Sequence, residues 1–326
     1  MLRGKRALVV GVANARSIAW EVADRWHREG AEVFVTYQNE RFRQPVEKLI
    51  RAKWGPYVGN SSNNNSNNSS NGGDDGPVPA APCDVSKEDD IAALWRTLQD
   101  RGLCSLSPGN AAASAVTASP AAAVGGLDPT GGNGGGQAGI GEGPQKIDIV
   151  LHSVAHAPTE AMRQGFLKGT TQEAFVSAHV VSAYSLVSMV RHGLPFLAPG
   201  ASVIALTYIG SQRAAANYNV MGPAKASLES CARALAQELG GPASANTVGP
   251  GGVRVNCLSP GPVRTMAARG IAGFDEMRLE AAARAPLGRG VGLDEIAGVA
   301  TFLASPLASA VTGQTVYADG GFSGVV

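Results

Sequence analysis

The stretch RALVVGVANARSIAWEVADRWHREGAEVFVTY, residues 6–37, decides the fold. It begins with an apolar run that ends at Gly11 and has the length of a short buried strand. From residue 18 to residue 26 the apolar positions recur with a helical period, and Gly30 is a natural helix stop. A second apolar run then completes the stretch as another strand. A strand, a helix and a strand form the βαβ unit that holds dinucleotides, so the sequence predicts an α/β fold.

The turn between the first strand and the helix departs from the dinucleotide motif G-x-G-x-x-G. It has Gly11, and the next five residues, VANAR, lead directly to Ser17 and Ile18. Glycine lets the backbone approach a pyrophosphate closely, and Ser17 with the amides after it offers donors at a helix N-terminus. The motif alone indicates nucleotide binding only weakly, and a strand–helix joint without a ligand is the alternative.

The rest of the chain continues the alternation of strands and helices. Strands are expected at residues 78–85, 147–153, 202–206, 253–258 and 314–322, and helices at residues 89–99, 171–193 and 293–303. Between them lie three segments of small, polar and glycine residues that cannot build a core. We expect these segments, residues 60–76, 102–144 and 240–251, to be disordered surface insertions.

Composition argues against several kinds of partner. The net charge is +1 and 16% of the residues are charged, so no basic face is expected for nucleic acid or an anionic membrane. No unbroken apolar run reaches the roughly 18 residues that span a bilayer. We therefore expect neither nucleic acid nor a membrane among the partners.

The cysteines and the N-terminus bear on the compartment. Cys83, Cys104, Cys231 and Cys257 have no C-x-x-C spacing and are expected to be reduced thiols rather than metal ligands. The first strand starts so near Met1 that no separate targeting segment is visible. We expect a soluble protein in a reducing compartment, cytoplasmic by default. Because low-complexity insertions are typical of eukaryotes, an organelle such as a mitochondrion or plastid is the alternative.

The stretch TYIGSQRAAANYNVMGPAKASLE, residues 207–229, carries the candidate chemistry. Tyr218 and Lys225 stand seven residues apart, so on a helix that starts near Tyr218 they share one face. A nearby ammonium favours phenolate and would lower the tyrosine pKa, which makes Tyr218 a candidate proton donor. Tyr208 follows an apolar strand and would project from its carboxyl end toward the same place.

Two observations leave an alternative open. An isolated Tyr-x6-Lys pair is more typical of a solvated helix surface than of an active site. Pro223 lies five residues after Tyr218, where a proline fits only if the helix has barely begun. A kink there would displace Lys225.

The tyrosines and the lysine together resemble the enoyl-(acyl-carrier-protein) reductases, the divergent branch of the short-chain dehydrogenase/reductase superfamily. These enzymes have Tyr-x6-Lys with a second tyrosine ten residues earlier, as Tyr218, Lys225 and Tyr208 are placed here. The commoner members of the superfamily have Tyr-x3-Lys and a serine thirteen residues before the tyrosine. In this chain Gly222 and Ala205 occupy those two positions.

The resemblance runs from Lys5 to the C-terminus, broken by the three insertions. The first turn matches as well, because the enoyl reductases also have glycine followed six residues later by Ser-Ile-Ala, here starting at Ser17. The resemblance implies one Rossmann-like domain over residues 1–326, a doubly wound parallel sheet of about seven strands with helices on both faces. It also implies a homotetramer.

The activity that the resemblance implies is reduction of the trans-2 double bond of an enoyl thioester on acyl-carrier protein, in fatty-acid biosynthesis. Gln38 follows the second strand where NADH-using members have the same residue, so NADH is expected rather than NADPH. Arg41 and Arg43 could read the 2'-phosphate of NADPH or simply be solvated. Another short-chain reductase acting on a carbonyl or alcohol, or an inactive NADH-binding scaffold, are the alternatives.

The resemblance also assigns residues to the site. The expected catalytic residues are Tyr208, Tyr218 and Lys225, with Tyr218 on the thioester oxygen and Lys225 on the nicotinamide ribose. The expected cofactor-binding residues are Gly11, Ser17, Ile18, Gln38, Asp84, Val85, Val154, Lys225, Val263, Arg264, Thr265, Met266 and Ala267. The expected substrate contacts are Ala157, Tyr208 and Tyr218.

Three further expectations concern the surroundings of this site. Asp84 would accept from the adenine amino group, or cap the helix that follows it. His156 stands where relatives usually have phenylalanine, and with His152 it lies on a strand-to-loop junction, so no metal site is expected. Residues 266–277, rich in Ala and Gly, match the segment that closes over the substrate.

Overall fold

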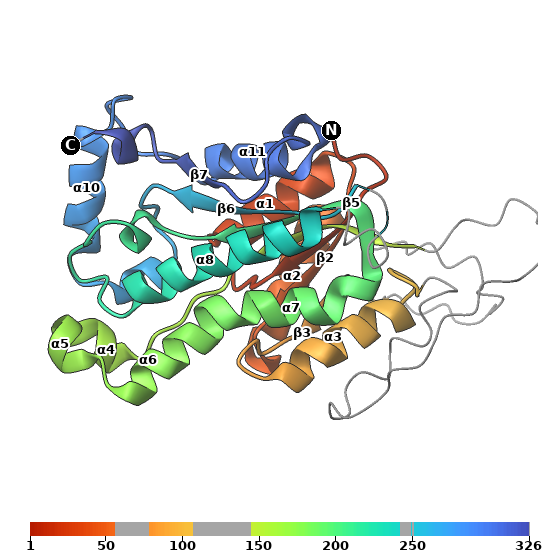
Figure 1. Ribbon diagram of the computed structural model, residues 1–326, viewed down its shortest axis with the longest axis horizontal. Helices are drawn as coiled ribbons and strands as arrows, with labels where there is room; N and C mark the ends of the chain where they lie inside the picture. The colour runs from red at the N-terminus through yellow and green to blue at the C-terminus, as the bar shows by residue number, and fades with distance from the viewer. Residues whose placement is uncertain (56–77, 107–144, 242–248, 250, 326) are drawn as a thin grey trace, which may run out of the picture.

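The computed structural model describes residues 1–55, 78–106, 145–241, 249 and 251–325 (Figure 1). Within them, seven parallel strands form one sheet in the order β3-β2-β1-β4-β5-β6-β7. The strands are β1 (Arg6–Val10), β2 (Glu32–Tyr37), β3 (Ala80–Pro82), β4 (Ile147–His152), β5 (Leu197–Leu206), β6 (Arg254–Pro260) and β7 (Thr315–Ala318). The predicted doubly wound parallel sheet of seven strands is confirmed.

Helices cover both faces of this sheet (Figure 1). One face packs against α1 (Ile18–Arg28), α2 (Arg43–Trp54) and α11 (Leu293–Ala304). The other packs against α3 (Glu88–Asp100), α7 (Ser185–Gly193) and α8 (Met221–Gly240). At the carboxyl ends of the strands lie α4 (Thr159–Arg163), α5 (Gly165–Gly169) and α10 (Phe274–Arg284). Each face of the sheet is apolar because both are covered, as all-parallel sheets require.

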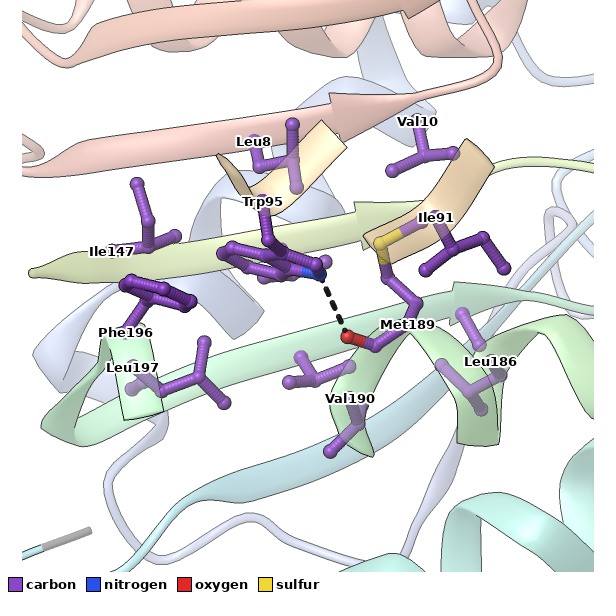
Figure 2. Close-up of a cluster of buried hydrophobic side chains, with 14 of the residues drawn as sticks. Leu8, Val10, Ile91, Trp95, Ile147, Leu186, Met189, Val190, Phe196 and Leu197 are labelled. Atoms are coloured by element: carbon purple, nitrogen blue, oxygen red, sulfur yellow. Dashed lines mark hydrogen bonds between the residues drawn. The ribbon is translucent and has the colours of Figure 1, made fainter. Parts of the chain in front are cut away.

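Trp95 of α3 lies in the middle of one core (Figure 2). Its ring stacks on Phe196 with the centroids 5.7 Å apart, and its indole N–H donates to the backbone oxygen of Met189 at 3.1 Å. Gly193 passes so close that a Cβ there would overlap the indole ring. Because Met189 and Gly193 belong to α7, this contact fixes α7 against α3.

The predicted insertions 60–76, 102–144 and 240–251 fall largely outside the described residues. The first of them lies wholly outside these residues, whereas the edges of the second and third are described and differ from expectation. Leu103 and Cys104 are only 6% and 1% exposed, so the chain stays in the core past residue 102. Ser105 N–H then donates to the Gln145 carbonyl at 2.7 Å, which brings the two ends of the second insertion together. Gly240 is the last residue of α8 rather than part of a loop.

One helical segment bears on the expectation that the protein has no membrane partner. Residues 172–196 comprise α6 (Gln172–His179), the π-helical turn η3 (Val180–Tyr184), α7 and a short 3-10 turn. Among the described residues this is the one segment long and apolar enough to cross a membrane by length and composition. Half of its most apolar window (50%) is buried inside the protein. A core helix passes the same test, so the segment is weak evidence for a membrane span.

Candidate active site

A cavity of about 530 Å³ opens at the carboxyl ends of β1 and β4. These two strands are neighbours, and the strand order runs in opposite directions from them. Open α/β sheets bind ligands at such a switch point. Most of the predicted cofactor-binding residues line this cavity: Gly11, Ser17, Ile18, Gln38, Asp84, Val85, Val154, Lys225, Thr265 and Met266.

Gly11 lines the cavity directly after β1 and packs against the loop that follows β4. Its φ of 100° is in the left-handed region, and a Cβ would overlap the Ser153 carbonyl and the Val154 side chain. A side chain at position 11 would therefore be strained and would push β1 away from the loop after β4. The close approach that glycine was expected to allow toward a ligand also serves the packing of the protein itself.

Ser17 has a local role at the start of α1. Its Oγ accepts from Trp20 N–H at 3.2 Å as the N-cap, and both its own N–H and its hydroxyl donate to the Asn14 carbonyl. The donors of Ser17 are therefore used within the turn. The first amides of α1, which include Ile18 N–H, remain the donors that a helix N-terminus offers to an anion.

Two predicted cofactor residues, Val263 and Arg264, are not in the cavity lining. Val263 packs against the core, and Arg264 forms an ion pair with Asp275 of α10 at 2.9 Å. Ala267 begins the 3-10 turn η7 (Ala267–Gly270), whose start is capped by Thr265 Oγ1 accepting from Ala268 N–H at 3.1 Å.

The adenosine end of the cavity is formed by residues after β2 and β3. Gln38 and Asp84 both line it. Asp84 Oδ1 accepts from the N–H and the hydroxyl of Ser86, and α3 begins at Glu88 with Lys87 as its N-cap, so Asp84 does not cap that helix. Arg43 is held on α2 by Glu47 at 2.9 Å, and neither it nor Arg41 lines the cavity.

The cavity also has lining residues that sequence reasoning did not find. Ser177 and Val181 come from α6 and η3, on the opposite side from β1, and Phe42 follows Gln38. No local pattern distinguishes them from neighbouring residues, because their place depends on how the helix crosses the sheet.

The two tyrosines meet beside this cavity. The rings of Tyr208 and Tyr218 pack edge to face with centroids 4.9 Å apart, and Ala157 packs against the same cluster. Gly210 lies against both rings, and a Cβ there would come within 2.5 Å of Tyr218 and 3.2 Å of Tyr208. The predicted substrate residues are therefore neighbours, although none lines the cavity. Sequence reasoning missed Gly210, because only the ring of Tyr218, eight residues later in the chain, requires glycine at this position.

The segment expected to cover the substrate lies over the tyrosines. Tyr208 OH donates to Met277 Sδ at 3.4 Å, and Ile271 packs against the tyrosine cluster. Asn217 Nδ2 donates to the Ala272 carbonyl at 2.8 Å. In this arrangement residues 271–277 close one side of the tyrosine pair.

A helix starts near Tyr218 as expected, but the expectation that Tyr218 itself lies on it is wrong. The helix α8 starts at Met221, and Tyr218 lies in the preceding turn between two left-handed residues, Asn217 with φ 60° and Asn219 with φ 43°. Asparagine tolerates this conformation better than most residues. Pro223 is the third residue of α8, in the first turn, where no intrahelical N–H bond is lost. It therefore does not displace Lys225.

The expected lowering of the Tyr218 pKa is also wrong. Tyr218 is 8% exposed, and burial raises its pKa, with further contributions from Tyr208 and Glu229. Lys225 is buried too, and burial lowers its pKa from 10.5 to about 8. Its Nζ donates to the Leu206 carbonyl at 2.6 Å. Tyr218 is thus a neutral phenol, suited to donating a hydrogen bond rather than to forming phenolate.

The two histidines after β4 occupy different environments. His152 is fully buried, its Nε2 lies 2.7 Å from Ser185 Oγ, and burial together with Lys225 lowers its pKa to about 3. His156 lies at the cavity, and its backbone N–H donates to Ser182 Oγ at 3.1 Å. The serines belong to η3 and α7, so the π-helical turn holds the loop after β4.

Comparison with known proteins is decisive at this point. A family model described as Enoyl-(Acyl carrier protein) reductase matches residues 11–59 and 138–323. The chain belongs to this enoyl reductase family. An enoyl-(acyl-carrier-protein) reductase (NADH) of Salmonella typhimurium is 34% identical over 322 residues, which are 99% of this chain and 95% of that protein. The corresponding protein of Bacillus cereus is 31% identical over 99% of this chain and 98% of that protein.

Solved structures of enoyl reductases have the same fold. The enoyl-(acyl-carrier-protein) reductase (NADH) of Aquifex aeolicus matches with a TM-score of 0.71 and 30% identity, over 98% of this chain and 97% of that chain. The enzyme of Anaplasma phagocytophilum, solved in complex with NAD, matches with a TM-score of 0.71 and 25% identity, over 99% of this chain and 95% of that chain. This enoyl reductase therefore shares its seven-stranded architecture with relatives along nearly its whole length.

Proposed function

We propose that this protein reduces the trans-2 double bond of an enoyl thioester, carried on acyl-carrier protein, with NADH in fatty-acid biosynthesis. The observation that carries the proposal is the buried, neutral phenol of Tyr218, packed against Tyr208 beside a cavity at the dinucleotide-binding edge of the sheet. Relatives that bear this enzyme name match along the whole chain.

The residues around the cavity fit NADH. Gly11 lines the cavity, and the N-terminus of α1 offers amides to a pyrophosphate. Gln38 would meet the adenosine ribose, neither Arg41 nor Arg43 lines the cavity, and the relatives are named as NADH enzymes, which supports NADH over NADPH. An ammonium has three N–H donors, and Leu206 uses one at Lys225, which leaves donors for the nicotinamide ribose. When bound, NADH supplies the hydride that reduces the β-carbon.

The tyrosine pair of this chain would act on the thioester of the substrate. Hydride addition at the β-carbon places negative charge on the thioester oxygen, and the Tyr218 hydroxyl donates a hydrogen bond to it. A proton taken up at the α-carbon then completes the reduction. Burial keeps that hydroxyl protonated, so it stabilises the enolate without first losing its proton. Tyr208 packs on the same ring and fixes its direction. Residues 271–277 exclude water from the pair.

The test is oxidation of NADH with trans-2-enoyl thioesters of increasing chain length, on acyl-carrier protein and on coenzyme A, with NADPH in parallel. We expect turnover with NADH. Reduction of ketones in preference to enoyl thioesters would support a different short-chain reductase. Tight NADH binding without turnover on either class would support a catalytically inactive scaffold.

We further propose a homotetramer in a reducing compartment, with acyl-carrier protein as partner. Phe175 and Val176 on α6 are 41% and 51% exposed, and a second copy would cover such apolar side chains. The thiols of Cys83, Cys104 and Cys257 are buried and unpaired by disulfides. Light scattering coupled to size exclusion tests the tetramer, and a monomer at micromolar concentration would contradict it.

Gly210→Ala is expected to lower kcat about tenfold or more, because its methyl group would push the Tyr218 ring out of line and small misplacements at a reacting centre are costly. Gly298→Ala is the control, since nothing lies within 4 Å of a Cβ at that helical position and alanine favours helices. Steady-state kinetics with both variants checks this. Equal kcat in the two variants would mean that the tyrosine ring tolerates displacement.

NADH affinity is expected to hold below pH 7 and to fall as the pH rises through about 8, because Lys225 then loses its proton and its charge. The groups that face Lys225 are His152 from β4, Cys257 from β6 and Glu229 on α8. An unshifted lysine would hold its charge up to a pH of about 10. Fluorescence titration of NADH across this range distinguishes the two cases, and constant affinity to the higher limit would contradict the lowered pKa.

A further inference from the structure

Glu229 is a buried carboxylate that the proposed reaction does not use. It lies on α8 one turn beyond Lys225 and is 4% exposed. Glutamate is almost never buried to this extent unless its hydrogen bonds are satisfied, because removing a carboxylate from water is costly. The groups that satisfy it therefore show which part of the protein it organises.

The side-chain donors to Glu229 come from one segment of chain. Thr207 Oγ1 donates to Oε1 at 2.7 Å and Ser211 Oγ donates to the same oxygen at 2.5 Å. Gln212 Nε2 donates to Oε2 at 3.4 Å. These residues bracket the turn η5 (Ile209–Ser211), which leaves β5 and begins directly after Tyr208.

This segment forms one wall of the tyrosine pair. Tyr208 packs its ring on Tyr218, and Gly210 lies against both rings with no room for a methyl group. Gly210 also contacts the start of α8, since its carbonyl would lie 3.0 Å from a Cβ on Gly222. A shift of the segment by a fraction of an ångström would therefore move the ring of Tyr218.

We infer that Glu229 is a positioning residue, whose carboxylate fixes residues 207–212 so that Tyr208 and Gly210 hold the Tyr218 hydroxyl toward the thioester oxygen. This inference rests on the proposed reductase function and deepens it. It assigns Glu229 an action through the tyrosine pair and no contact with substrate or cofactor.

Glu229 also affects its neighbours through its charge, and two substitutions separate the effects. Glu229→Gln retains one oxygen that can accept from Thr207 and Ser211, but it removes the charge. Glu229→Leu removes both the charge and the acceptors. Because the carboxylate raises the pKa of Lys225, loss of charge in either variant should move the alkaline fall of NADH affinity to lower pH. A lower kcat caused by displacement of residues 207–212 should appear only in Glu229→Leu.

We expect kcat to be about tenfold lower in Glu229→Leu and within about threefold of wild type in Glu229→Gln. This pattern follows if Glu229 acts by aligning the Tyr218 hydroxyl, since only the leucine variant loses the hydrogen-bond acceptors. Glu238→Gln, an exposed glutamate on the same helix, is the control. The deciding readout is a double-mutant cycle with Tyr218→Phe. If Glu229 acts through the Tyr218 hydroxyl, Glu229→Leu lowers kcat no further in the Tyr218→Phe background.

Multiplicative losses in that cycle, or a Glu229→Leu enzyme with wild-type kcat, would overturn the inference while leaving the reductase function intact. Should the leucine variant fail to fold, Thr207→Val and Ser211→Ala carry the same cycle, since each removes one donor to Oε1. Wild-type protein without turnover would overturn the proposed function and the inference together.

Discussion

Tyr218→Phe is expected to lower kcat by about two to three orders of magnitude, the usual cost of removing one donor to a developing oxyanion. The substitution deletes one oxygen and leaves the ring in place against Tyr208 and Gly210. Because the Tyr218 phenol is buried and its pKa is raised, it stays protonated and acts as a hydrogen-bond donor at neutral and mildly alkaline pH. The loss should therefore be nearly independent of pH between about 6 and 9, well below the ordinary tyrosine pKa of about 10.

Steady-state kinetics with an enoyl thioester checks this prediction, alongside NADH titration. NADH affinity should stay within about twofold of wild type, because an interaction made only in the transition state changes kcat and not ground-state binding. Tyr184→Phe is the matched control, since Tyr184 lies on η3 and bonds to Glu88 at the surface. A Tyr218→Phe enzyme with nearly full kcat would show that another group stabilises the enolate.

Lys225→Met is expected to weaken NADH binding by about 10- to 100-fold, the range that loss of hydrogen bonds from a charged group implies. Methionine keeps most of the length and the apolar character of the side chain, so the helix packing of α8 should persist. At saturating NADH, kcat should fall much less than it does in Tyr218→Phe. This contrast separates a residue that holds the cofactor from one that acts on the substrate.

The Lys225→Met variant should also lose the fall in NADH affinity above a pH of about 8, since the group that titrates is gone. Isothermal titration at several pH values measures both effects. Lys53→Met, an exposed lysine on α2, serves as the control. Unchanged NADH affinity in Lys225→Met would contradict the assignment of this lysine to the cofactor.

The start of α8 shows why local spacing was a poor guide to the site. A seven-residue separation places Tyr218 and Lys225 on one helical face only if both are helical, and Tyr218 is not. Asn217 and Asn219 instead set a turn. The Asn217 side chain donates to the Ala272 carbonyl of the covering segment, 55 positions away, and the Asn219 side chain donates to the Met162 carbonyl of α4, 57 positions away. Those partners are not visible in a local pattern. This turn places Tyr218 in the tyrosine pair, whereas Lys225 lines the cavity from α8.

The sequence by itself determined the α/β class and the seven strands, and most of the cofactor-binding residues predicted from it line the cavity. Strand and helix periodicities are local consequences of which faces are buried, so they can be read from a short stretch such as residues 6–37. The residues after each strand, such as Gly11 and Gln38, then follow because parallel strands present their carboxyl ends at one edge.

The tertiary structure alone decided the electrostatics of the site and its supports. Burial, contributed by residues far apart in the chain, raises the pKa of Tyr218 and lowers that of Lys225, where spacing had predicted a lowered tyrosine pKa. The need for glycine at position 210 and the bonds of Glu229 arise from contacts between separate elements. The physical reason is that a pKa and a steric fit depend on everything within a few ångströms in space, whereas a sequence pattern reports only neighbours along the chain.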